Sequence, residues 1–146
     1  MALKAVFFDV GETLVDEERW WRVLAEREGL QPHVVWAALG VTIERGEEHS
    51  ELWGHLGIDR HFDPGRQVLA CVTFLESVVE LAGCAADEVA YIGDRVDDDV
   101  LPAAAPGLLA VHVRRGPWGR LQRTPPEAAV GPDDLASLPD ALALLL

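Results

Sequence analysis

Two carboxylates stand directly after apolar runs, where a parallel sheet would bring them together. Asp9 follows the run Ala5–Phe8, and Asp94 follows Val89–Ile92 and a glycine. In an open parallel sheet, ligands bind beyond the carboxyl ends of the strands, so neighbouring strands would place these two side chains at one point. Three further carboxylates come shortly after the second of them: Asp97, Asp98 and Asp99. The spacing therefore predicts a cluster of up to five acidic side chains.

A cluster of this kind requires a cation, because like charges at one point repel each other. Hard oxygen ligands suit Mg²⁺, which binds through one or two carboxylates together with waters and substrate phosphate. The acidic triplet also has a second explanation, since negative charge is favourable at the start of a helix. Asp9 is harder to explain in that way, because a strand-end Asp followed by Gly11 and Thr13 exceeds what a turn requires.

The elements that would position these carboxylates alternate between strands and helices, which favours an α/β fold with a mainly parallel sheet. Strands are expected at Ala5–Phe8, Val89–Ile92 and Leu108–Val113, with a last edge strand at Ala128–Val130. The first is a continuous apolar run, typical of a strand buried on both faces. Helices are expected at residues 17–28, 32–43, 47–56, 98–105 and 133–145, with a Gly-, Pro- and Arg-rich loop at 114–127. We expect the first three helices to form a small helical subdomain, because no strand separates them.

The apolar segment 68–82 leaves two interpretations open. Either residues 68–72 form a strand and 74–82 a helix, or the whole run is one buried helix. Periodicity does not distinguish these cases for short apolar runs. In both cases Gly83 ends the helix.

The sequences around the two strand-end carboxylates resemble motifs of the haloacid dehalogenase (HAD) superfamily. VFFDVGETLVD resembles its first motif and YIGDRVDDDV its fourth, while residues 74–119 follow its helix–strand–loop–helix–strand course. Residues 16–60 resemble the start of a helical cap less specifically. The resemblance implies a single domain with a reduced HAD-like Rossmannoid core, formed by residues 1–15 and 66–146. A small helical cap-like insertion would occupy residues 16–65.

The resemblance also implies a mechanism and a metal site. In that family the first Asp attacks phosphorus and forms an aspartyl phosphate, which water then cleaves. Carried over, Asp9 is the nucleophile and a Mg²⁺ ligand. The Gly11 carbonyl and Asp94 would be further ligands, and Asp99 or Asp98 would act through water.

Four more residues are candidates for contacts around the substrate. Thr13 would brace the turn after the first strand, and Arg95 and Arg114 would supply positive charge to a phosphorylated substrate. If residues 68–73 form a strand, Thr73 would bind a phosphoryl oxygen. Otherwise Thr73 caps the helix that follows it.

Three features depart from the family pattern. Gly11 stands where the family's phosphatases place a second Asp, whose general acid–base help is worth roughly 10²–10⁴-fold in rate. No lysine follows Lys4, whereas the family's third motif carries a lysine at a place that falls near Leu69. Asp9 and Asp94 are 85 residues apart (94 − 9 = 85), which is short for a capped relative.

These features keep three functions open. The first is Mg²⁺-dependent hydrolysis of a small phosphate ester. The second is a degenerate HAD domain that serves as a binding or assembly module. A truncated sheet would leave an open edge, and a second copy of the chain would cover it in a homodimer. The third is hydrolysis of a carbon–halogen bond, although that reaction needs no acidic metal site.

Composition narrows the setting of the protein. The 146 residues carry a formal net charge of −13, which disfavours nucleic acid and anionic membranes as partners. The two cysteines, Cys71 and Cys84, lie in apolar contexts and fit neither a zinc site nor a disulfide framework. Since no signal peptide or membrane span is expected either, the sequence favours a cytoplasmic protein.

Overall fold

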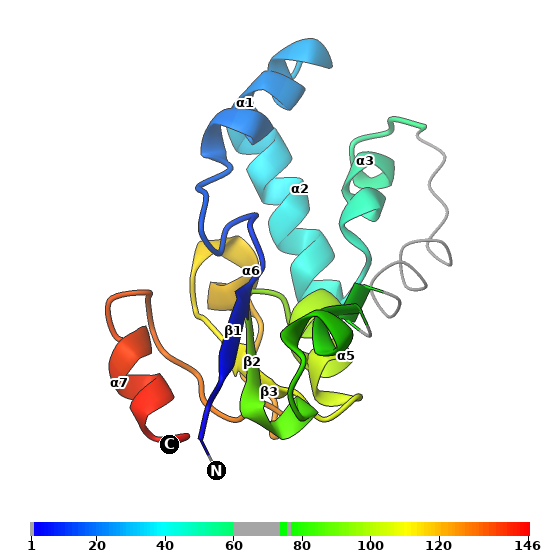
Figure 1. Ribbon diagram of the computed structural model, residues 1–146. Helices are drawn as coiled ribbons and strands as arrows, with labels where there is room; N and C mark the ends of the chain where they lie inside the picture. The colour runs from blue at the N-terminus through cyan, green and yellow to red at the C-terminus, as the bar shows by residue number, and fades with distance from the viewer. Residues whose placement is uncertain (1, 60–73, 76) are drawn as a thin grey trace. The chain divides into compact units, whose positions relative to one another are not determined.

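The computed structural model describes residues 2–59, 74–75 and 77–146 (Figure 1). The candidate residue Thr73 and the ambiguous segment 68–73 lie outside the described residues. The chain divides into two compact units. One combines Met1–Val15 with Gly65–Leu146, and the other is Asp16–Pro64.

The first unit is built on a parallel sheet, in agreement with the predicted α/β class. Its three strands are β1 (Ala5–Phe8), β2 (Val89–Gly93) and β3 (Leu109–His112), in the order β1-β2-β3. Both pairings are parallel, and the register sets Phe8 opposite Ile92. The carboxyl ends of β1 and β2 are therefore neighbours.

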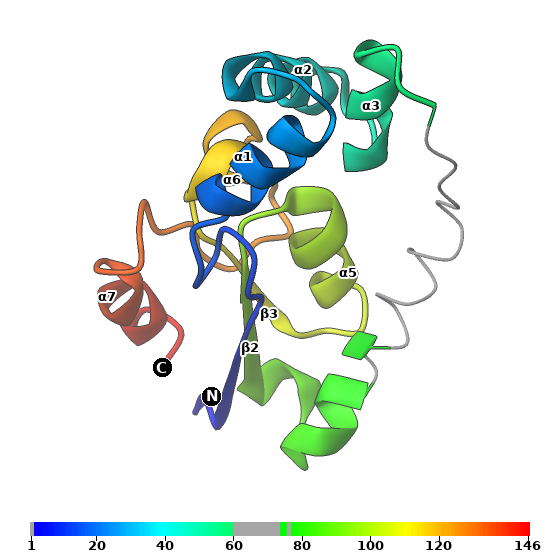
Figure 2. The same ribbon diagram turned by 90° about the horizontal axis from the view of Figure 1, so that it is seen from above.

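Apolar side chains cover β2 and β3 on both faces. On one face lie helical residues at 74–75 and 77–82, the one-turn 3₁₀-helix η2 (Ala86–Glu88), the π-helical turn η3 (Val96–Val100) and α5 (Leu101–Ala104). On the other face lies α7 (Leu138–Ala143), whose Leu138 packs with Ile92 and Val111. Figure 2 shows α5 and α7 on opposite sides of the sheet. The helix expected at 98–105 is thus divided into a π turn followed by a short α-helix.

The prediction that the first strand is buried on both faces is wrong. Phe7 packs toward the core cluster that contains Tyr91, but the outward Val6 and Phe8 are each 38% exposed. The reason is the strand order, because β1 is an edge strand among the described residues. The inner strands β2 and β3 fit the expectation of continuous burial much better.

The expected edge strand Ala128–Val130 is reduced to one bridge. Val130 pairs in parallel with Val111, and its carbonyl accepts a hydrogen bond from the amide of His112 at 3.1 Å. The amide of Ala129 donates to the carbonyl of Ala110 at 2.8 Å. This segment runs beside β3 without continuing as a ladder.

Part of the segment 114–127, expected to be a loop, is the helix α6 (Gly116–Leu121). Pro117 lies in its first turn, where proline is tolerated because the missing amide has no helical partner there. Gly119 is required inside the helix, because a Cβ atom there would come within 2.6 Å of the carbonyl oxygen of Val113. Glycine and proline here mark the start and the close packing of a helix.

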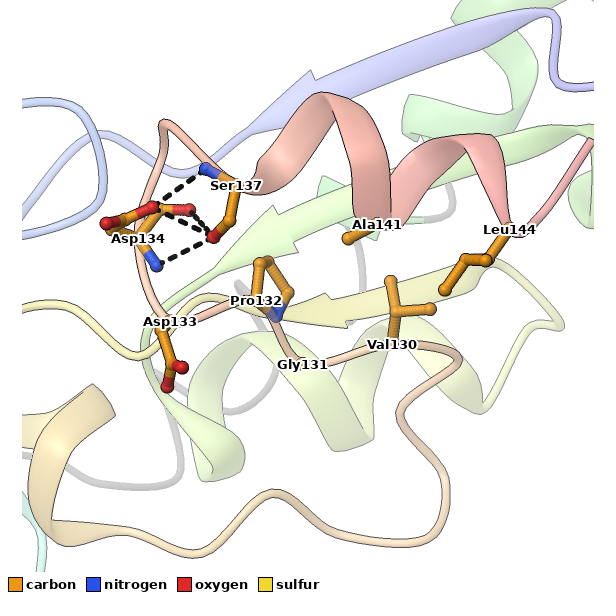
Figure 3. A pocket seen from close by; sticks show the side chains of 8 residues that line it. All are labelled: Val130, Gly131, Pro132, Asp133, Asp134, Ser137, Ala141 and Leu144. Atoms are coloured by element: carbon orange, nitrogen blue, oxygen red, sulfur yellow. Dashed lines mark hydrogen bonds between the residues drawn. The ribbon is translucent and has the colours of Figure 1, made fainter.

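The last helix begins later than residue 133. Asp134 and Ser137 form a hydrogen-bonded turn before it, in which the amide of Ser137 donates to the carboxylate of Asp134 at 2.8 Å (Figure 3). Side chains that bond to nearby amides compete with the helical ladder. An open pocket of about 530 Å³ lies between this turn, α7 and the segment 130–132.

The second unit is helical. It contains α1 (Glu18–Arg27), α2 (Pro32–Arg45), the 3₁₀ turn η1 (His49–Glu51) and α3 (Leu52–His55). Trp21 of α1 lies against Trp36 of α2, with ring centroids 6.0 Å apart. None of the described helices is long and apolar enough to span a membrane.

Candidate active site

Asp9, Asp94 and Asp99 lie together at the carboxyl ends of β1 and β2. The amide of Asp9 donates to the carbonyl of Ile92 at 2.8 Å, which continues the ladder one residue beyond the strand. Each of the three carboxylates offers an oxygen atom, and these oxygens lie within 4.8 Å of one another. The structure thus brings together three of the residues that the sequence predicted for a metal site.

Asp99 reaches this cluster because η3 turns the chain back toward β2. Its Oδ2 atom accepts a hydrogen bond from the amide of Arg95 at 2.9 Å. Its carboxyl group packs directly on Gly93, where an added Cβ atom would lie 2.2 Å from Cγ of Asp99. A glycine before Asp94 is therefore a requirement of this arrangement. Single π turns are frequent at functional sites.

The other two carboxylates of the acidic run both pair with Arg95. Its Nη1 atom lies 2.8 Å from Oδ2 of Asp98, and its Nη2 atom pairs with Asp97. The guanidinium group also lies over the ring of Trp118, 4.1 Å from the ring centroid. Arg95, a predicted substrate-binding residue, is thus held within its own loop.

The three clustered carboxylates carry raised pKa values. Burial raises the pKa of Asp9, and burial followed by the charge of Asp9 raises the pKa of Asp94 to about 7. The same two causes raise the pKa of Asp99 well above its usual range. In all three groups burial is the largest cause, and it outweighs the lowering of the pKa by nearby hydrogen bonds and by Arg95.

Asp94 has a further property that fits a cation. Its Oδ1 atom accepts a hydrogen bond from the Thr13 hydroxyl at 3.3 Å. Its Oδ2 atom is buried and has no hydrogen-bond partner among the described residues. A buried carboxylate oxygen without a donor is costly unless a cation binds it. The donor set of three carboxylates suits Mg²⁺ or another hard divalent ion.

The turn after β1 has an unusual backbone. The carbonyl of Gly11 accepts a hydrogen bond from the amide of Thr13, and its role as a metal ligand stays a prediction. Glu12 is the only non-glycine residue with positive φ (52°) among the described residues, and it is 9% exposed. A glutamate gives no sign in the sequence that it adopts this conformation.

Three further residues lie near the cluster, and two of them, His112 and Gln122, were missed. His112 is fully buried, and its Nε2 atom lies 3.1 Å from the carbonyl oxygen of Asp94. Burial lowers the pKa of His112, so the ring is neutral and can donate to that oxygen. Arg115 and Gln122 flank α6 and hydrogen-bond to the turn after β1 and the loop after β2, respectively. The Gly- and Pro-rich composition of this segment predicted a loop, so a helix that contacts both acidic loops was not expected there.

Of the remaining candidates, Thr73 lies outside the described residues and Arg114 follows β3. Arg114 pairs with Asp133 at 3.8 Å. Lys4, the only lysine of the chain, pairs with Glu88 at 2.8 Å. Because Lys4 precedes β1 and Asp9 follows it, the lysine lies at the opposite end of the strand from the cluster.

Part of the chain is similar to a known protein family. Residues 72–138 match the model of the HAD-hydrolase-like family. A comparison with curated proteins finds no match. Among the solved structures, a matching one is the crystal structure of a HAD phosphatase from Thermococcus onnurineus. The two chains are 15% identical over 95% of this chain and 97% of that one, with a TM-score of 0.44.

The matched residues include the elements that carry two of the three clustered carboxylates. They contain β2 with Asp94, the π turn with Asp99, β3 and α6. Through residues 72–138, the chain is similar to the HAD-hydrolase-like family.

Proposed function

We propose that this protein is a Mg²⁺-dependent hydrolase of a small phosphate ester, acting through an aspartyl-phosphate intermediate. The observation that carries the proposal is the cluster of Asp9, Asp94 and Asp99, in which the buried Oδ2 atom of Asp94 lacks a hydrogen-bond partner among the described residues. The cytoplasm is the proposed setting, supported by the free thiol of Cys84.

The three carboxylates would divide two tasks. Asp94 and Asp99 are buried, whereas Asp9 is only partly buried and so remains accessible to a substrate. Asp94 and Asp99 would hold the ion together with one oxygen of Asp9. When bound, Mg²⁺ would neutralise negative charge on the transferring phosphoryl group.

Asp9 would act as the nucleophile. One of its carboxylate oxygens attacks phosphorus, the phosphorus–oxygen bond of the ester breaks, and the leaving oxygen departs with the electron pair. A water molecule then attacks phosphorus, which frees inorganic phosphate and restores the Asp9 carboxylate. Thr13 keeps Asp94 oriented during both steps through its hydrogen bond.

The proposed substrate class depends on whether the protein can donate a proton to the leaving oxygen. Gly11 has no side chain that could donate it, so the reaction gains no help from that position. Esters whose leaving groups are acidic, such as aryl phosphates, need little protonation as they depart. We therefore expect the protein to favour such substrates over alkyl phosphates.

Replacement of the nucleophile tests the proposal. Asp9→Asn removes the attacking oxyanion with little change in shape, so hydrolysis of an aryl phosphate with Mg²⁺ should be abolished. Asp140→Asn, the same change at an exposed position in α7, serves as the control and should leave the rate unchanged. Equal rates for the wild type and Asp9→Asn across a panel of phosphate esters would refute the mechanism.

A second candidate function is a binding or assembly module without turnover. It is supported by the exposed Val6 and Phe8 on edge strand β1, which a second copy of the chain could cover. Light scattering tests this candidate, since it requires a mass above that of the monomer. A monomer at all concentrations would argue against it.

A further inference from the structure

The segment around α6 contacts both loops that carry the clustered carboxylates. On the β1 side, Nη1 of Arg115 donates to the carbonyl of Thr13 at 2.6 Å. Gly116 lies against Glu12 so closely that a Cβ atom at Gly116 would come within 2.7 Å of Cβ of Glu12. Both residues have a positive φ, 63° for Gly116 and 52° for Glu12, a conformation that glycine adopts readily and glutamate rarely.

On the β2 side, the same segment holds the start of η3. Oε1 of Gln122 accepts a hydrogen bond from the amide of Val96 at 2.7 Å, and Nε2 donates to Oδ1 of Asp97 at 3.0 Å. Trp118 is 4% exposed, and the guanidinium group of Arg95 stacks over its ring. One side chain of α6 and one just after it therefore fix this loop.

The contacts of Arg115 and Gln122 each lead to a residue that is hydrogen-bonded, itself or through its chain neighbour, to a carboxylate of the cluster. Thr13, whose carbonyl Arg115 holds, donates its hydroxyl to Asp94. Arg95, the residue before Val96, donates its amide to Asp99. The segment thus reaches two of the three clustered carboxylates through different loops.

The helix α6 packs closely against the rest of its unit. Gly119 packs on the backbone of Val113 and Arg114, and Trp118 is buried beside it. A rigid support is what a metal site needs, because partners behind the ligands fix the orientation of the ligands.

From these contacts we infer that α6 and its flanks set the geometry of the proposed Mg²⁺ site, with Arg115 and Gln122 as positioning residues. Neither residue touches the ion or the substrate in this role. The inference rests on the metal-binding part of the proposed function, and it goes beyond that function by assigning roles to two residues outside both acidic loops.

Calorimetric titration with Mg²⁺ in the absence of substrate tests the inference. Arg115→Met and Gln122→Leu remove the two tethers while keeping much of the side-chain volume. Each should weaken Mg²⁺ binding by about tenfold or more, the usual effect of losing a partner behind a metal ligand. Arg120→Met, the same change on the exposed side of α6, is the matched control and should bind Mg²⁺ like the wild type.

A second measurement separates positioning from general destabilisation. The melting temperature of each variant is recorded in EDTA, where a positioning role predicts little change relative to the control. If Arg115→Met fails to fold, Arg115→Lys takes its place: it retains a donor and should restore part of the affinity. Folded Arg115 and Gln122 variants that bind Mg²⁺ as tightly as the wild type would overturn the inference, as would an equal loss in Arg120→Met.

The outcome is distinguishable from a failure of the proposed function. If Mg²⁺ binding depends on Arg115 and Gln122 but no Asp9-dependent hydrolysis is found, the inference stands and the enzymatic proposal falls. If hydrolysis depends on Asp9 while the tether variants bind Mg²⁺ normally, the reverse holds. A wild-type protein that binds no Mg²⁺ would overturn both.

Discussion

At the scale of single residues, the site is defined by carboxylates that the protein does not neutralise. Arg95 pairs with Asp97 and Asp98, while Asp9, Asp94 and Asp99 share a buried space without a cationic side chain paired to them among the described contacts. Such an arrangement costs stability when all three are ionised. The cost has a measurable dependence on pH and on metal.

Asp94 allows this dependence to be predicted with its sign. Burial and the charge of Asp9 raise its pKa in the folded protein from 3.8 to about 7. Between these values the unfolded chain releases its proton more readily than the folded one, so the metal-free protein should lose stability as pH rises from about 4 to about 7. Mg²⁺ should therefore raise the melting temperature more at pH 7 than at pH 5.

The variant Asp94→Asn isolates this contribution, because other titrating groups are common to both proteins. In EDTA, the melting temperature of the wild type should fall relative to that of Asp94→Asn as the pH rises from 5 to 7. A difference that stays constant over this range would contradict the raised pKa.

Gly11 allows a gain of function to be predicted. Its φ lies outside the left-handed region, so the backbone conformation itself does not disfavour a side chain there. Gly11→Asp would add a proton donor beside the nucleophile and should raise kcat/KM on alkyl phosphates by about tenfold or more, with a smaller gain on aryl phosphates. Gly11→Asn is the control, since it has the same shape without the proton. Equal gains from both variants would show that acid catalysis is not the cause.

At the scale of elements, the sequence located the strands that carry the site but not the helix that supports them. Asp9 and Asp94 could be placed because apolar runs ending in a carboxylate are read directly from residue order, and parallel strands bring their ends together. The α/β class followed from the same alternation. The edge position of β1 was not predicted, because burial on a second face depends on which strands lie beside it.

The support by α6 could not be predicted for a different reason. Gly116, Pro117 and Gly119 are turn-forming residues in most contexts, and here each has a separate role in a short helix. Arg115 and Gln122 act across 102 and 26 residues of chain, a separation at which residue spacing gives no information. Tertiary contacts override local preference at this element.

At the scale of the whole molecule, the described parts of the site belong to one of the two compact units. Asp9 and Thr13 lie in Met1–Val15, and Asp94, Asp99 and α6 lie in Gly65–Leu146. The intervening helical unit, Asp16–Pro64, has its own packed helices. Binding of the metal should therefore depend on the first unit, whereas the choice of substrate is open to both.

This division predicts the result of removing the helical unit. In the shortened chain, a flexible Gly/Ser linker of about ten residues replaces residues 16–64. This chain should still bind Mg²⁺ with an affinity within about threefold of the full chain. The reason is that such a linker is flexible enough to leave the sheet undisturbed. Calorimetric titration measures this, and Asp94→Asn in the shortened chain controls for binding elsewhere on the acidic surface. A folded shortened chain whose Mg²⁺ affinity falls tenfold or more would show that the helical unit takes part in the site.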